Sequence, residues 1–100
     1  MSGKGFFEFK DGRWYRGSYE RDLKEGHGIY VSPKDGQTYE GMWHRGKMHG
    51  QGVLSKDTGT VFTGTWAFGK KHGILEMKLK TGLVRRGHWV EDKWLHWIPW

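Results

Sequence analysis

The sequence of 100 residues has no cysteine, only two prolines and no long apolar run. Without cysteine, the chain can form neither a disulfide framework nor a thiolate zinc site. No apolar run approaches the roughly 18 residues that cross a bilayer. Residues 1–4 also lack the apolar core of a secretory signal peptide. We therefore expect a soluble, cytoplasmic protein.

Hydrophobic residues are few as well, because they make up only 35% of the chain and the mean hydropathy is −0.83. A core of two thick layers is not expected from such a composition. Aromatic residues, however, make up 16% of the chain, and glycine contributes 17 residues. One buried aromatic ring covers roughly 150–250 Å². We therefore expect burial to come mainly from flat rings.

Glycine and aromatic residues recur with a period of about 22 to 24 residues. The motif aromatic-x-Gly-x-aromatic begins at Tyr15, Tyr39 and Phe62, and a decayed copy begins at Arg85. A turn with glycine closes each full unit. The period divides one domain, residues 1–100, into a half repeat at 3–12, full repeats at 15–36, 39–59 and 62–82, and a degenerate fourth repeat or cap at 85–100.

Residues 39–52 read Tyr-x-Gly-x-Trp-x-x-Gly-x-x-His-Gly-x-Gly. This motif resembles the MORN (membrane occupation and recognition nexus) repeat, and the resemblance extends over nearly the whole chain. It implies an all-β fold in which each repeat forms one β-hairpin. The hairpins would stack into an elongated single-layer antiparallel sheet, a solenoid of MORN repeats.

The residue pattern itself also predicts a hairpin in each repeat. A two-residue turn at Arg45 and Gly46 requires positive φ, which suits glycine first and asparagine or aspartate next. Asp22 and Asp92 stand at the glycine position in other repeats. A continuous register from this turn gives the following pairs: Trp43 with Met48, Gly41 with Gly50, and Tyr39 with Gly52. The rings would then lie over strand positions that have no side chain.

Strict alternation along these strands gives the sheet two unlike faces. We define the aromatic face by the residues that this alternation places there: Phe7, Phe9, Tyr15, Tyr19, Tyr30, Tyr39, Trp43, Leu54, Phe62, Trp66, Met77 and Trp89. The other face, the outer face, is polar and mostly basic. In the last unit, the same alternation places Trp94, Ile98 and Trp100 on the aromatic face, and Leu95 and Trp97 on the outer face.

The aromatic face is the first candidate for a binding site, because contiguous apolar area usually marks a partner surface. A helical or extended segment of another protein, or a second copy of this chain, would lie along a groove formed by Tyr19, Tyr39, Trp43, Trp66 and Trp89. A second candidate is the apolar chain end. It would act as a cap of the repeat stack or as an anchor in a larger assembly, through Trp94, Trp97, Ile98 and Trp100.

Lysines recur just before the turn that closes each unit. Stacked hairpins would align four of them along one edge of the sheet: Lys10, Lys34, Lys56 and Lys80. With a net charge of +6, this edge could bind acidic lipid headgroups or an acidic protein surface. The simpler interpretation is a row of solvated turn residues, partly neutralised by Asp11, Asp35 and Asp57.

Histidines are the first candidates for catalysis or metal binding. His49 and His72 stand at equivalent positions two strands apart, so we expect roughly 10 Å between them. His44 and His49 form a diagonal pair that lacks a third ligand. We therefore interpret His49 and His72 as repeat residues that pack beside a turn. Without a nucleophile motif either, we expect no enzyme, no metal and no cofactor.

Two functions remain open at this point. Proteins that resemble this repeat are common in ciliary axonemes and other cytoskeletal assemblies, which implies a scaffold or adaptor that docks protein partners. The alternative is a peripheral membrane module that binds phosphoinositides or other acidic phospholipids. Nucleic acid is not an expected partner, because no RNA- or DNA-binding motif is present.

Overall fold

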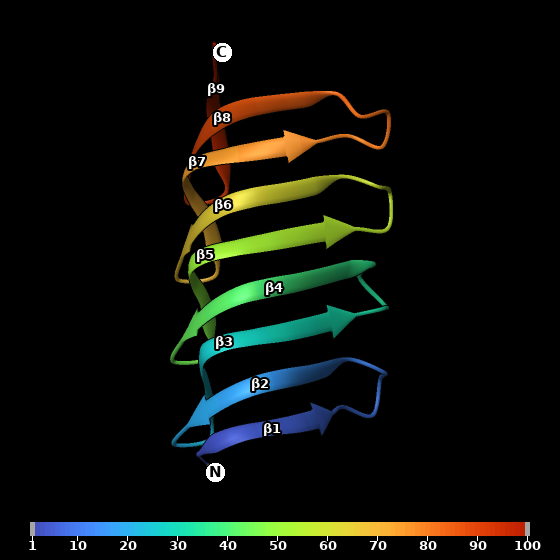
Figure 1. The fold of residues 1–100 in the computed structure, drawn as a ribbon, viewed down its shortest axis with the longest axis vertical. Coiled ribbons are helices and arrows are strands. Elements are labelled where there is room, and N and C mark those ends of the chain that lie inside the picture. Colours follow the sequence, from blue (N-terminus) through green and yellow to red (C-terminus); the bar gives the residue numbers. More distant parts are fainter. Residues whose placement is uncertain (1, 100) are drawn as a thin grey trace.

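The computed structural model describes residues 2–99, which form one open sheet of nine antiparallel strands and contain no helix (Figure 1). The strands are β1 (Gly3–Glu8), β2 (Trp14–Glu20), β3 (Leu23–Ser32), β4 (Gln37–His44), β5 (Lys47–Lys56), β6 (Val61–Ala67), β7 (Lys70–Lys78), β8 (Val84–Val90) and β9 (Lys93–Ile98). Each strand pairs with its neighbours in the sequence. The molecule measures 44 × 23 × 17 Å. The predicted all-β, elongated single-layer sheet is confirmed.

Tight two-residue turns join β2 to β3, β4 to β5, β6 to β7 and β8 to β9. In the turn between β4 and β5, Arg45 has φ 48° and Gly46 has φ 84°. Positive φ at both positions is typical of a type I′ turn, which matches the twist of the strands. Asp22 and Asp92, with φ 67° and 70°, take the glycine position in other turns. The turn chemistry predicted from the sequence is therefore confirmed.

The same turns also bind each hairpin to the one before it. The amide of Gly46 donates a hydrogen bond of 2.9 Å to the carbonyl oxygen of Lys24, in the preceding hairpin. The amides of Gly69 and Asp92 make the equivalent bonds one and two repeats later. This repeated bond fixes how successive hairpins stack.

The pairing within a hairpin departs from the predicted register a few residues after the turn. Trp43 lies opposite Met48, as predicted. Gly41, however, lies opposite Gly52 and not opposite Gly50. The prediction of a continuous register was therefore wrong.

A β-bulge explains this difference. Residues 49–51 face the single residue Met42, so that Tyr39 pairs with Leu54 instead of Gly52. Gly50, in the middle of the bulge, has φ 94°, a conformation that favours glycine. The same irregularity recurs between β2 and β3 and between β6 and β7. Two extra residues preserve the alternation of side chains, so the predicted faces survive the error in register.

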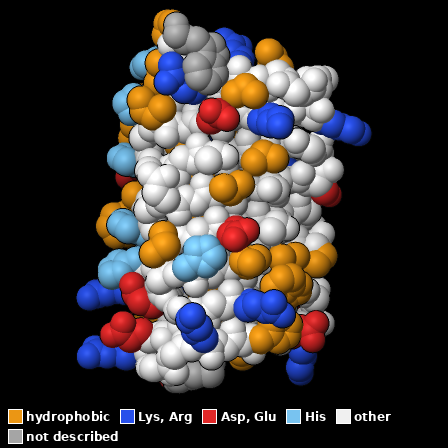
Figure 2. Space-filling view, in the orientation of Figure 1, with side chains coloured by type: hydrophobic (Ala, Val, Ile, Leu, Met, Phe, Trp, Pro, Cys, Tyr) orange, Lys and Arg blue, Asp and Glu red, His pale blue; other side chains and the backbone are white. Residues whose placement is uncertain are grey.

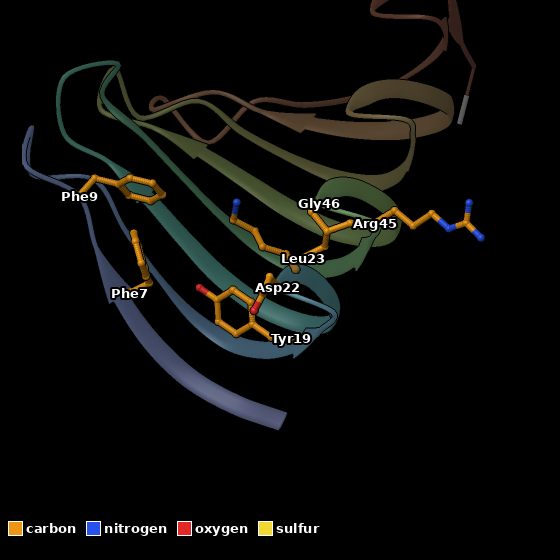
Figure 3. A pocket seen from close by; sticks show the side chains of 8 residues that line it. Phe7, Phe9, Tyr19, Asp22, Leu23, Arg45 and Gly46 are labelled. Carbon is orange, nitrogen blue, oxygen red and sulfur yellow. The ribbon is translucent and has the colours of Figure 1, made fainter. Parts of the chain in front are cut away.

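The bulges bend the strands, and the sheet curves into a trough around the side chains drawn in Figure 3. The aromatic face is the concave side. The buried apolar side chains all come from this face: Tyr15, Tyr39, Trp43, Leu54, Phe62, Trp66, Leu75 and Trp89. All of them except Leu75 were predicted to lie there. A single curved layer thus provides its own core.

In each of the first two full repeats, a tyrosine is buried against a pair of glycines. Gly41 and Gly52 face each other across the strands, and a Cβ atom on Gly52 would overlap the ring and hydroxyl of Tyr39. The Tyr39 hydroxyl donates a 2.9 Å hydrogen bond to the carbonyl oxygen of Met42. Burial raises the pKa of Tyr39 to about 12, so the phenol is protonated and remains a donor at neutral pH. Tyr15 has the same arrangement in the first repeat.

Aromatic contacts between repeats extend this packing along the trough. The rings meet edge to face, with centroid distances of 5.5 Å for Tyr15 and Trp43, 5.3 Å for Tyr39 and Trp66, and 5.9 Å for Phe62 and Trp89. Edge-to-face pairs add roughly 0.5–1.5 kcal/mol to the effect of burial. In every case, the first ring of one repeat contacts the tryptophan of the next repeat. The repeats are therefore coupled to their nearest neighbours through rings.

In the later repeats, a large side chain on the second strand occupies the place of the second glycine. Leu75 lies opposite Gly64 and is fully buried. Trp97 lies opposite Gly87 in the last hairpin. In the first two full repeats, the tyrosine ring thus packs over the second glycine. In the last two, a side chain of the second strand fills that space.

The last hairpin also corrects the predicted faces of β9. Its register shifts by one residue at Leu95. One extra residue reverses the alternation of the side chains that follow. Trp97 therefore lies on the aromatic face opposite Gly87, and Ile98 lies on the outer face opposite Arg86. The predicted faces of Trp97 and Ile98 were wrong for this reason.

Trp97 joins the aromatic packing at the end of the stack. Its ring lies 5.9 Å from Trp89 and 5.2 Å from Trp94, and the guanidinium of Arg85 lies 4.1 Å above it. These contacts pack Trp97 against the buried ring of Trp89 at the end of the stack. Trp100, predicted to act with these residues, lies outside the described residues.

We predict that Gly52→Ala lowers the free energy of unfolding by about 1–3 kcal/mol, because the added methyl group displaces the ring of Tyr39. Urea denaturation measures this change. Gly69→Asp is the control, since the space around Gly69 is open and aspartate already occupies the equivalent turn position at Asp22 and Asp92. Its effect should stay below about 1 kcal/mol. Equal effects of the two substitutions would contradict the proposed packing.

We further predict that Trp97→Ala lowers the free energy of unfolding by about 2–3 kcal/mol, because it uncovers Trp89 while the ring removed is only partly buried. Leu95→Ala, at the exposed bulge of the same strand, should change it by less than about 1 kcal/mol. Thermal unfolding followed by circular dichroism compares the two variants. A larger effect at Leu95 would show that Trp97 does not close the core.

Candidate functional site

The five residues predicted to form the partner groove all lie on the aromatic face, but most of them are buried. Tyr39, Trp43, Trp66 and Trp89 are exposed by 7% or less, whereas Tyr19 is partly exposed. The four buried rings therefore form the floor of the trough, and little of their surface is left for a partner to touch. The curvature of the sheet causes this burial.

The accessible apolar surface of the trough lies over its first strands. Phe7 and Leu23 each expose 46% of their surface. Together with Phe9 and Tyr19 they border a hollow of about 550 Å³. Figure 3 shows the rings of Phe7 and Phe9 on one side of this hollow and Tyr19 on the other. The side chain of Arg45 points away from it.

A second hollow of about 270 Å³ adjoins the first one. Phe9, Lys24 and Gly46 line both hollows. The remaining lining residues of the second hollow are Arg13, Tyr30, Gln37, Tyr39, Trp43, Met48 and Leu54. We call the two hollows together the docking groove. It runs along the trough from β1 to β5.

Lys24 lies where the two hollows meet. Its ammonium is 5.5 Å from the ring centroids of Tyr15 and Tyr30 and 5.3 Å from that of Trp43. Burial and, to a smaller extent, the positive charge of Arg13 lower the pKa of Lys24. The groove therefore contains a positive charge that is held mainly by aromatic faces.

Arg13 lines the second hollow beside Phe9 and Tyr30. Its guanidinium lies 4.6 Å over the ring of Phe9 and donates a 3.3 Å hydrogen bond to the hydroxyl of Tyr30. It also forms an ion pair of 2.8 Å with Asp11. Hydrogen bonding to Arg13 holds the pKa of Asp11 below its ordinary value. The charge of Arg13 is thus largely compensated by its own turn.

Sequence reasoning missed Leu23 and Lys24 as groove residues. Both residues follow directly after a turn, where the pattern of glycines and rings does not indicate which way their side chains point. The register does contain a signal for Lys24. Lys24 lies opposite Tyr19 in the first repeat, just as Met48 lies opposite Trp43 in the second. A residue at this position belongs to the aromatic face.

The four lysines predicted to form a basic row, Lys10, Lys34, Lys56 and Lys80, lie in or beside the turns of one long edge (Figure 1). Acidic residues occur in the same turns at Asp11, Asp35 and Asp57. The ammonium of Lys56 leans over the ring of Phe62, at 5.6 Å from the ring centroid. The four lysines therefore do not form a continuous positive row, because aspartates stand among them and Lys56 points toward Phe62.

The histidines lie apart from the docking groove. Figure 2, which views the outer face, shows histidine side chains along one long side. The Nδ1 atom of His49 accepts a 3.4 Å hydrogen bond from the amide of Phe68, in the next turn. This confirms His49 as a repeat residue beside a turn. His44 contacts Glu25 at 3.0 Å. Among residues 2–99, no three metal-ligating side chains come close enough to hold an ion.

No segment within residues 2–99 is a helix that could cross a membrane. A comparison with curated proteins gives no match. The family model of the MORN repeat, however, matches residues 15–37, 39–61 and 62–74, which together make up more than half of the chain. MORN repeats serve in general as non-enzymatic modules that bind proteins or membranes. From this match and the stack of hairpins, we conclude that the chain belongs to the MORN repeat family.

Proposed function

We propose that the protein is a non-enzymatic scaffold that binds a helical or extended segment of a protein partner in its docking groove. The observation that carries this proposal is the exposed apolar wall of the groove. Phe7 and Leu23 stand nearly half exposed beside the partly exposed rings of Phe9, Tyr19 and Tyr30. Contiguous exposed rings of this kind usually mark a surface for a protein partner.

The shape of the groove suits a segment of polypeptide. It crosses five strands, from β1 to β5. With neighbouring strands about 4.8 Å apart, its length is roughly 19 Å. A helix of about 13 residues has this length. The two hollows would receive large side chains from such a segment.

Phospholipid binding, the alternative function, has less support. A cluster of four to eight adjacent lysines and arginines is typical of segments that bind acidic membranes. The four lysines of the long edge are instead spaced one per repeat, and three of them have an aspartate in the same turn. The groove supports the binding of a protein segment, and the family resemblance supports its placement in a cytoskeletal assembly such as that of a cilium or flagellum.

Site-specific photocrosslinking in cells that produce the protein tests this proposal. A photoreactive amino acid at Tyr19 or Leu23 should crosslink to one defined protein, because both side chains line the groove. The same amino acid at Val53 or Ile74, exposed on the outer face, is the matched control and should not capture that protein. Equal capture from both faces, or capture only from the outer face, would contradict the proposal.

A further inference from the structure

Lys24 has no carboxylate partner in the part of the chain that the structure describes. The ion pairs within residues 2–99 involve other cations, among them Arg13 and Lys71. Asp22 also lines the first hollow, but no ion pair joins it to Lys24. The guanidinium of Arg45 points away from the groove (Figure 3). The charge of Lys24 is therefore directed into the groove without an ion pair to a carboxylate of residues 2–99.

The equivalent lysine two repeats later does have an anion. Lys71 lies opposite Trp66 as Lys24 lies opposite Tyr19. Its ammonium is 3.6 Å from the carboxylate of Asp92, in the turn of the following hairpin. The amide of Asp92 also donates a hydrogen bond to the carbonyl oxygen of Lys71. The chain itself thus supplies a carboxylate to this lysine.

At Lys24, the position that corresponds to Asp92 is occupied by Gly46. The amide of Gly46 donates to the carbonyl oxygen of Lys24, just as the amide of Asp92 donates to that of Lys71. Glycine has no side chain, so the space beside the lysine is left open, and Gly46 lines both hollows of the groove. The docking groove therefore lacks one carboxylate that the repeat architecture could have provided.

A carboxylate brought by a partner would fill this place. A half-buried ammonium has lost part of its hydration, and an opposite charge within about 4 Å stabilises it more than it would in water. Aromatic and aliphatic walls lie on both sides of Lys24, with Phe7 and Leu23 in the first hollow and Tyr30 and Met48 in the second. Large apolar side chains of the same partner segment would fit these two hollows.

We infer, resting on the proposed function of the docking groove, that the groove selects partner segments in which an aspartate or glutamate lies between two large apolar residues. Lys24 binds the carboxylate, and the two hollows receive the apolar side chains. Lys24 is thus a residue that determines specificity, whereas the apolar walls supply affinity.

A random peptide library displayed on phage, selected on the immobilised full chain, tests this inference. The unmodified protein should enrich peptides with an acidic residue flanked by large apolar ones. Lys24→Met, which copies the residue that the second repeat has at this position, should enrich apolar peptides without the acidic preference. Gly46→Asp should have the same effect, because it supplies the carboxylate from the chain itself. Lys71→Met removes an equal charge outside the groove and should behave like the unmodified protein.

One selected peptide then allows a quantitative comparison. Replacing its acidic residue by the corresponding amide should weaken binding to the unmodified protein about tenfold, as expected for a hydrogen bond to a charged group. Binding to Lys24→Met should change less than about twofold. Fluorescence anisotropy with the labelled peptide measures both affinities.

The possible results separate the inference from the proposed function. Enrichment of apolar peptides without an acidic preference, or an acidic preference that persists in Lys24→Met, would overturn the inference and leave the groove as a docking site. Loss of the preference in Lys71→Met would overturn it as well, because net charge alone would then explain the selection. If no variant enriches any peptide, both the inference and the proposed function are wrong.

Discussion

The packing of a tyrosine ring on a pair of facing glycines is the interaction on which the rest of this structure depends. Without a second layer, an aromatic ring on an ordinary sheet would stand above side chains and remain exposed. Gly41 and Gly52 remove those side chains, so Tyr39 lies directly on the backbone. Its ring can then meet Trp66 of the next repeat in an edge-to-face contact. The glycines thus place the tyrosine ring where it can contact the tryptophan of the next repeat.

This packing also explains where the protein can bind a partner. In the later repeats, Leu75 and Trp97 occupy the second glycine position and help to fill the trough from within. The first repeats keep glycine there, and the docking groove lies over their strands. Lys24 adds a charge that forms no ion pair within the described residues. One repeat motif therefore produces a closed end and an open end through a few substitutions.

Much of the fold can be predicted from the sequence because glycines, rings and turn residues recur with one period. The hairpins, the type I′ turns and the two faces follow from local chemistry. The register does not follow from local chemistry, because the sequence does not distinguish a glycine in a bulge, such as Gly50, from a glycine under a ring. The face of Trp97 depends on a single extra residue at Leu95. The burial of the predicted groove rings depends on the curvature of the whole sheet, which no local pattern contains.

Hydroxyl-radical footprinting of the free protein and of its complex purified from cells tests the central claim most directly. The claim is that the curved sheet buries its own rings and leaves the docking groove open for a partner. Met48 lines the groove, and Met42 is exposed on the outer face, so one side chain reports on each face. We predict that oxidation of Met48 and Tyr19 falls in the complex while that of Met42 is unchanged. Protection of Met42 with unchanged oxidation of Met48 would contradict the account.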